Sequence, residues 1–196
     1  MKETTSKDPL ARLAERQTWI TPDAQRSTQK AVSDLTDRLG GRKLKEALHG
    51  DWLHEPLHAI LTDVPIGAWT ATIAFDALGT ISGRSTFDAA ADATIVVGLI
   101  GAAGAAITGL NDWSTVQNPA AKRIGAVHGL LNVLAVGLFI GSSIARKGDS
   151  RSTGKALAAL GYLVVSASAH LGGNLVYEHG IGVSPDRADT HPKLER

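Results

Sequence analysis

The sequence contains no cysteine among its 196 residues. Without thiols the chain can form neither disulfides nor thiolate zinc sites, and it cannot itself hold an iron–sulfur cluster. The chain also lacks an excess of positive or negative charge, because its formal net charge is only +1. Nucleic-acid-binding domains usually carry a strongly basic surface, so no nucleic-acid partner is expected.

Several short signatures are missing as well. The sequence has no CxxCH, HExxH or Gly-rich phosphate-binding motif that would identify a cofactor or substrate. Its polar N-terminus has no apolar stretch followed by a small-residue cleavage site, so we expect no signal peptide.

Four long apolar segments are present, at 57–81, 93–110, 124–145 and 156–177. The mean hydropathy of +0.01 would suit a soluble protein, but the charges are segregated between these segments. The last three segments contain no Asp, Glu, Lys or Arg and are long enough to cross a bilayer as helices. The first segment can cross a bilayer only if Asp76 is tolerated inside it.

Short connections join these segments, so antiparallel neighbours are expected. The sequence therefore predicts an all-α fold, an integral membrane four-helix up-down bundle with an N-terminal amphipathic helix. The predicted domains are a polar N-terminal tail and amphipathic helix at 1–50, a four-helix transmembrane domain at 51–180, and a polar C-terminal tail at 181–196.

The amphipathic helix is predicted to begin at Pro22 and to stop at Gly40. Its apolar residues recur at steps of three and four, which makes a one-sided helix: Ala31, Val32, Leu35 and Leu39. Two interpretations stay open. The helix covers one end of the core, or it lies at the membrane interface with basic residues against lipid headgroups.

Pro65 complicates the first apolar segment, because proline removes a backbone hydrogen bond inside a helix. Either the helix is bent at Pro65, or it begins near Asp63 with that residue as its N-cap and Pro65 in its first turn. The second segment has rows of small residues four apart that favour close helix contact: Gly98, Ala102 and Ala106, and Gly101, Ala105 and Gly109.

Polar residues from all four segments are expected at one end of the bundle, the near face, which also holds the N-terminus. From the helical rise, we expect His128 about 6 Å and His170 about 10 Å below that face. His58 is expected at the face itself. We expect His128 and His170 to be buried. Five further polar or aromatic residues are predicted to support this site: Asp63, Asp112, Trp113, Asn132 and Asn174.

Three functions are open for these histidines. His58, His128 and His170 could ligate the iron of haem b in an electron-transfer component, because imidazoles on facing helices bind haem. The same residues could instead hold another metal in a membrane enzyme. In the third interpretation they only bond between helices in a non-enzymatic subunit or scaffold, so the sequence does not decide whether the chain is an enzyme.

Four stretches carry a resemblance to a known family: WLHEPLHAILTDVPIGAW from Trp52, TGLNDW from Thr108, RIGAVHGLLN from Arg123 and HLGGNLVYEHGIGV from His170. The chain resembles the DUF2231 family of four-helix bacterial membrane proteins. The family's first motif usually has the form LGHPLHP, so His58 matches its second histidine. Glu55 stands where the first histidine is usual, and His54 lies one place earlier.

The resemblance implies a multi-pass protein of the bacterial inner membrane. Some similar proteins continue into a Rieske domain, which implies a separate Rieske-type redox partner for this chain, and a homo-oligomer is also open. Lys and Arg near the spans are more numerous on the near face, which places both termini in the cytoplasm. The near face has Arg38, Arg42, Lys43, Lys45, Lys122, Arg123, Arg187, Lys193 and Arg196; the far face has Arg84, Arg146, Lys147, Arg151 and Lys155.

Overall fold

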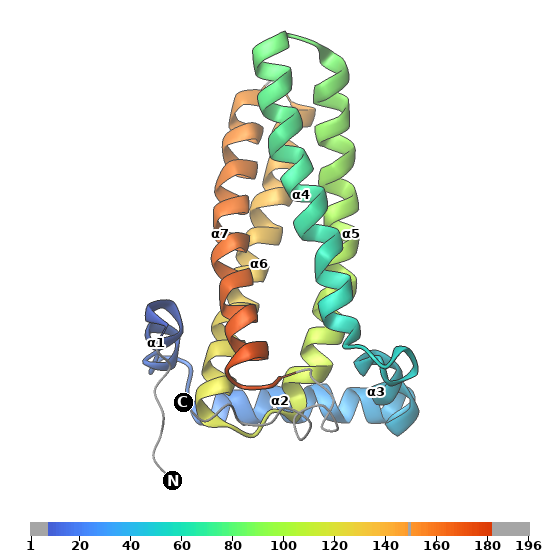
Figure 1. Ribbon diagram of the computed structural model, residues 1–196, viewed down its shortest axis with the longest axis vertical. Coiled ribbons are helices and arrows are strands. Elements are labelled where there is room, and N and C mark those ends of the chain that lie inside the picture. Colours follow the sequence, from blue (N-terminus) through green and yellow to red (C-terminus); the bar gives the residue numbers. More distant parts are fainter. Residues whose placement is uncertain (1–7, 149, 182–196) are drawn as a thin grey trace, which may run out of the picture. The chain divides into compact units, whose positions relative to one another are not determined.

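The computed structural model describes residues 8–148 and 150–181, which form helices and connections without any strand (Figure 1). The elements are α1 (Pro9–Glu15), α2 (Pro22–Leu39), α3 (Gly41–His49), the short 3-10 helix η1 (Asp51–Leu53), α4 (Leu57–Ser82), α5 (Ser85–Thr115), α6 (Pro119–Lys147) and α7 (Arg151–Tyr177).

The chain divides into two compact units, which are described separately. The bundle unit comprises residues 61–106 and 127–170, and therefore the greater part of α4 to α7. The end unit comprises residues 1–60, 107–126 and 171–196, and therefore α1 to α3 with one end of each long helix.

All four long helices are long and apolar enough to cross a membrane, as the sequence predicts. In the bundle unit their segments run side by side, and Gly83 and Arg84 form a tight connection between α4 and α5 (Figure 1). Trp69 and Phe139 stack at the centre of this unit, with ring centroids 4.0 Å apart. The expected up-down helical bundle is confirmed.

Helix α4 begins at Leu57 and runs without interruption through Pro65, so the alternative in which it begins near Asp63 is wrong. Pro65 is buried against α5 at a glycine. A Cβ atom on Gly101 would lie 2.6 Å from Val64 Cγ1 and 2.9 Å from Pro65 Cδ. The small residue at position 101 is therefore what allows α5 to approach the proline-containing turn of α4.

The long helices extend beyond the apolar segments that predict them. Helix α5 spans Ser85–Thr115, whereas its uncharged segment is 93–110. Asp88 and Asp92 are inside its first turns, and Arg146 and Arg151 are similarly inside α6 and α7. The predicted segments stop at charged residues. In the structure these charged side chains pair with one another, and the helices continue through them.

The end unit contains two differences from the sequence prediction. Part of the expected N-terminal tail is helical, because Pro9 begins α1 and the Asp8 carboxylate caps it. Helix α2 has the predicted bounds, but its apolar stripe is not its buried face. Leu35 and Leu39 are 57% and 70% exposed. The predicted tail after Ile181 lies outside the described residues.

Polar contacts connect the other face of α2 to the connection between α5 and α6. The Gln29 side-chain amide donates to the carbonyl oxygens of Trp113 at 2.8 Å and Val116 at 3.0 Å. Gln25 and Thr36 are buried on the same helix. These side chains explain how a helix with exposed leucines is nevertheless held within the end unit.

Candidate functional site

His128, on α6, is hydrogen-bonded through both ring nitrogens. Its Nδ1 lies 2.8 Å from the Ser168 carbonyl oxygen on α7, and its Nε2 lies 3.1 Å from Asn132 Nδ2 one helical turn away. The Ser168 hydroxyl donates to the His128 carbonyl oxygen at 3.0 Å. A neutral imidazole with its proton on Nδ1 satisfies this pattern, donating to Ser168 and accepting from Asn132. His128 therefore links α6 to α7.

His170 lies two residues beyond Ser168, which places it about 200° further around α7. Ser168 is completely buried against α6, whereas the His170 side chain is exposed. The expectation that both histidines are buried is therefore wrong for His170, and His128 itself is only half-buried. His170 therefore does not share the face of α7 on which Ser168 contacts His128.

His58 belongs to the end unit, near the start of α4. Its ring lies against α5, where a Cβ atom on Gly109 would be only 2.7 Å from His58 Cε1. Thr108 Oγ1 is 3.5 Å from His58 Nδ1. A glycine thus provides the space that a half-buried imidazole occupies between these two helices.

His49 is expected at the surface from the sequence, but it forms a contact between two helices. Its Nδ1 lies 2.8 Å from Asp112 Oδ1 and joins α3 to the end of α5. Beside it, the Asn111 amide donates to the Lys45 carbonyl oxygen at 3.3 Å. Asp112 is buried, so the histidine supplies a partner for a carboxylate that solvent hardly reaches.

The remaining predicted site residues have separate environments. Asp63 is exposed in the interior of α4 and does not cap its start, which is at Leu57. The Trp113 indole donates to the Lys122 carbonyl oxygen at 3.1 Å and so joins α5 to α6. Asn174 is buried in α7.

A second polar group, here called the charge cluster, lies in the bundle unit. It consists of three carboxylates and three cations: Asp76, Asp88, Asp92, Arg146, Arg151 and Lys155. Arg146 pairs with Asp76 through both terminal nitrogens, one of them 2.8 Å from Asp76 Oδ1. Both side chains are almost completely removed from solvent.

The other members of the charge cluster extend this pair toward the helix connections. Arg146 also contacts Asp92 Oδ1 at 3.2 Å, and Arg151 Nη2 lies 3.0 Å from the same oxygen. Asp88 Oδ1 contacts Arg151 Nε at 3.0 Å and Lys155 Nζ at 3.1 Å. All four long helices thus contribute, and the positive and negative formal charges are equal in number.

Comparison with known proteins bears on this architecture. The family model DUF2231, described as a predicted membrane protein, matches residues 54–185, more than half of the chain. The chain belongs to the DUF2231 family. Neither a curated protein nor a solved structure gives a significant match.

The region matched by DUF2231 includes His58, His128 and His170 as well as every member of the charge cluster. Across the described residues of this DUF2231 protein, no three His, Asp or Glu side chains form a group that could hold a metal ion. The histidine contacts instead involve serine, asparagine, threonine and aspartate.

From the sequence, Asp76 and Asp92 are expected to form only a small polar contact toward the far face, and the four other members of the charge cluster are not predicted. A usable signal was present. Asp76 interrupts an otherwise apolar span, and a buried carboxylate requires a cation. Arg146 and Arg151 lie beside the two apolar segments whose ends reach the level of Asp76. The sequence prediction used them only as far-face charges for the membrane orientation.

Proposed function

We propose that this DUF2231 protein is a non-enzymatic membrane subunit, in which the histidines serve as hydrogen-bonding groups between helices. The engagement of both His128 nitrogens carries this proposal. A neutral imidazole offers one donor and one acceptor, and here Ser168 and Asn132 use both. In such a subunit the histidines serve interhelical recognition, and lipid is the surrounding partner.

An absorption spectrum and unfolding measurements test this assignment together. The wild type and the His58→Ala, His128→Ala and His170→Ala variants are purified after expression with haem supplied. The subunit proposal expects no Soret band in the wild type and a lower unfolding temperature for His128→Ala than for His170→Ala. A Soret band that disappears in one or more of the variants would overturn it.

Haem b is the second candidate, supported by open space beside two of the histidines. A Cβ atom on Gly129, next to His128, would meet nothing within 4 Å, and the exposed His170 precedes two glycines. His128 and His170, which both belong to the bundle unit, would hold the iron, and His128 would exchange its Asn132 bond for the metal. Haem would supply one-electron transfer, which calls for a separate redox protein such as a Rieske-type partner.

The charges beside the four spans bear on how the chain is oriented in its membrane. We infer that the four spans cross a bacterial inner membrane with both termini in the cytoplasm, because Lys and Arg are more numerous beside the near-face ends. Reporter fusions at Ser82 and Arg196 test this topology. The Arg196 fusion should report the cytoplasm and the Ser82 fusion the opposite side, whereas one shared compartment would contradict four spans.

A further inference from the structure

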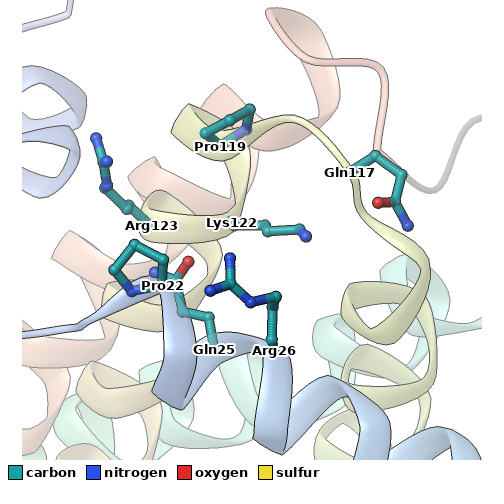
Figure 2. Close-up of a pocket in the computed structure, with 7 residues that line it drawn as sticks. All are labelled: Pro22, Gln25, Arg26, Gln117, Pro119, Lys122 and Arg123. Atoms are coloured by element: carbon teal, nitrogen blue, oxygen red, sulfur yellow. The ribbon is translucent and has the colours of Figure 1, made fainter.

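The start of α2 and the start of α6 line a pocket of about 100 Å³ within the end unit (Figure 2). Seven residues form it: Pro22, Gln25, Arg26, Gln117, Pro119, Lys122 and Arg123. Both helices begin there with a proline, and both are long enough to present the positive end of a helix dipole. None of the polar contacts described above for the histidines involves this lining.

Positive charge is concentrated in the lining. It contains three cations, Arg26, Lys122 and Arg123, and no carboxylate. Arg26 and Lys122 come from different helices and both line the pocket (Figure 2). Asp23 engages one nitrogen of Arg26 from outside the lining, which leaves the other guanidinium donors available. Like charges that gather at one pocket repel one another, and an anion bound there would relieve this repulsion.

Gln25 provides an independent observation. Its side chain is only 6% exposed, and it lies in the pocket lining between Pro22 and Arg26 (Figure 2). Its buried Nε2 has no hydrogen-bond partner among the residues that the structure describes. Buried amide donors are almost always paired, so an unpaired one at a cationic pocket indicates an acceptor that completes the site.

We propose that this pocket binds a phosphate-type anion. A phosphate group presents several strong acceptor oxygens, which match the guanidinium, ammonium and amide donors of the residues that line this pocket. The dipoles of α2 and α6 stabilise negative charge at the same place. The phosphate can belong to a lipid headgroup or to a soluble molecule, because the recognition chemistry is the same for both.

Calorimetric titration of the full chain in an uncharged detergent at low ionic strength tests this site. One arm uses inorganic phosphate and the other uses short-chain phosphatidylglycerol, with chloride added at matched ionic strength as the blank. Saturable binding in either arm is expected. Binding of inorganic phosphate identifies a soluble anion as sufficient, whereas binding of phosphatidylglycerol alone identifies a lipid headgroup.

Lys122→Gln should weaken the binding about tenfold, because it removes a charge-assisted hydrogen bond. Lys43→Gln is the matched control, since it makes the same substitution at an exposed position of α3 outside the pocket. The control should bind like the wild type. Equal affinities for the two variants, or no saturable binding in either arm, would overturn the proposal.

Gln25→Leu separates a binding role from a structural one and serves if Lys122→Gln does not fold. This change removes the unpaired donor, so the unfolding temperature without phosphate should stay level or rise. The increase in unfolding temperature that phosphate produces in the wild type should at the same time become smaller. A variant in which phosphate produces the full wild-type increase would contradict the assignment of Gln25 to the anion site.

Discussion

The charge cluster and the His128 contact both connect helices in the bundle unit, but they do so with different chemistry. Arg146 and Asp76 are full charges whose buried ion pair cannot be broken without leaving one of them unpaired. His128, Ser168 and Asn132 share neutral hydrogen bonds around a half-buried ring. The comparison suggests that the charges determine which helices can be neighbours, whereas the histidine adjusts a contact that packing already maintains.

Arg146→Met provides the strongest test of this difference. It leaves the Asp76 carboxylate buried without its main partner, so the free energy of unfolding should fall by about 3–5 kcal/mol. Chemical unfolding of the purified protein in detergent measures the change. Lys147→Met, at the exposed neighbouring position, should have almost no effect.

A second substitution shows whether the loss comes from the unpaired charge. Asp76→Leu combined with Arg146→Met replaces the pair by apolar side chains and should recover most of the stability, while Arg151 still neutralises Asp92. If the double variant were no more stable than Arg146→Met, lost packing rather than an orphaned carboxylate would explain the effect.

The sequence was sufficient for the fold because each long helix has its own apolar run. It also placed α2 correctly, since Pro22 and Gly40 mark its ends. It could not choose between starts for α4, because a proline inside a helix is tolerated only when a neighbour such as Gly101 makes room for it. That information belongs to another helix.

The candidate site was less predictable for a related reason. Depth along a helix placed the histidines at one end, but depth does not give direction around the helix. Ser168 faces α6 and His170 does not, although they are only two residues apart. The pairs Arg146–Asp76 and His49–Asp112 are likewise separated by 70 and 63 residues, so they depend on tertiary packing that periodicity does not contain.

Gly101→Leu tests whether close backbone approach contributes to the bundle independently of the polar groups. A larger side chain would collide with Val64 and Pro65, so we expect a loss of about 1–3 kcal/mol. Ile100→Leu is the matched control, because Ile100 is 70% exposed. Equal unfolding midpoints for the two variants would show that α5 does not need a small residue at this contact.

His128→Ala should have a smaller effect, about 1 kcal/mol, because neutral interhelical hydrogen bonds in membrane proteins are individually modest. Thermal unfolding in detergent measures it, with His170→Ala as the control for loss of an imidazole from an exposed position. A loss as large as that of Arg146→Met would remove the distinction between the neutral and charged contacts.

The smallest effect is expected at an exposed ion pair on α2, where charge is present without burial. Lys30 Nζ lies 2.8 Å from Asp34 Oδ2, and the two side chains are 75% and 47% exposed. The hydrogen bond from Lys30 lowers the pKa of Asp34, and the same bond raises the pKa of Lys30. Any stabilisation from Asp34 is therefore present at neutral pH and lost only as the pH falls through its lowered pKa.

Any stabilisation from Lys30 is likewise present at neutral pH, and it is lost only as the pH rises through the raised pKa of this residue. Asp34→Asn should nevertheless leave the unfolding midpoint at pH 7 unchanged in low and high salt, because water screens an exposed pair. Arg146→Met, measured in parallel, should be less stable than the wild type at both salt concentrations, since ions do not reach the buried pair. A salt-dependent loss in Asp34→Asn as large as that of His128→Ala would show that burial is not what separates the charge cluster from the other charges of this chain.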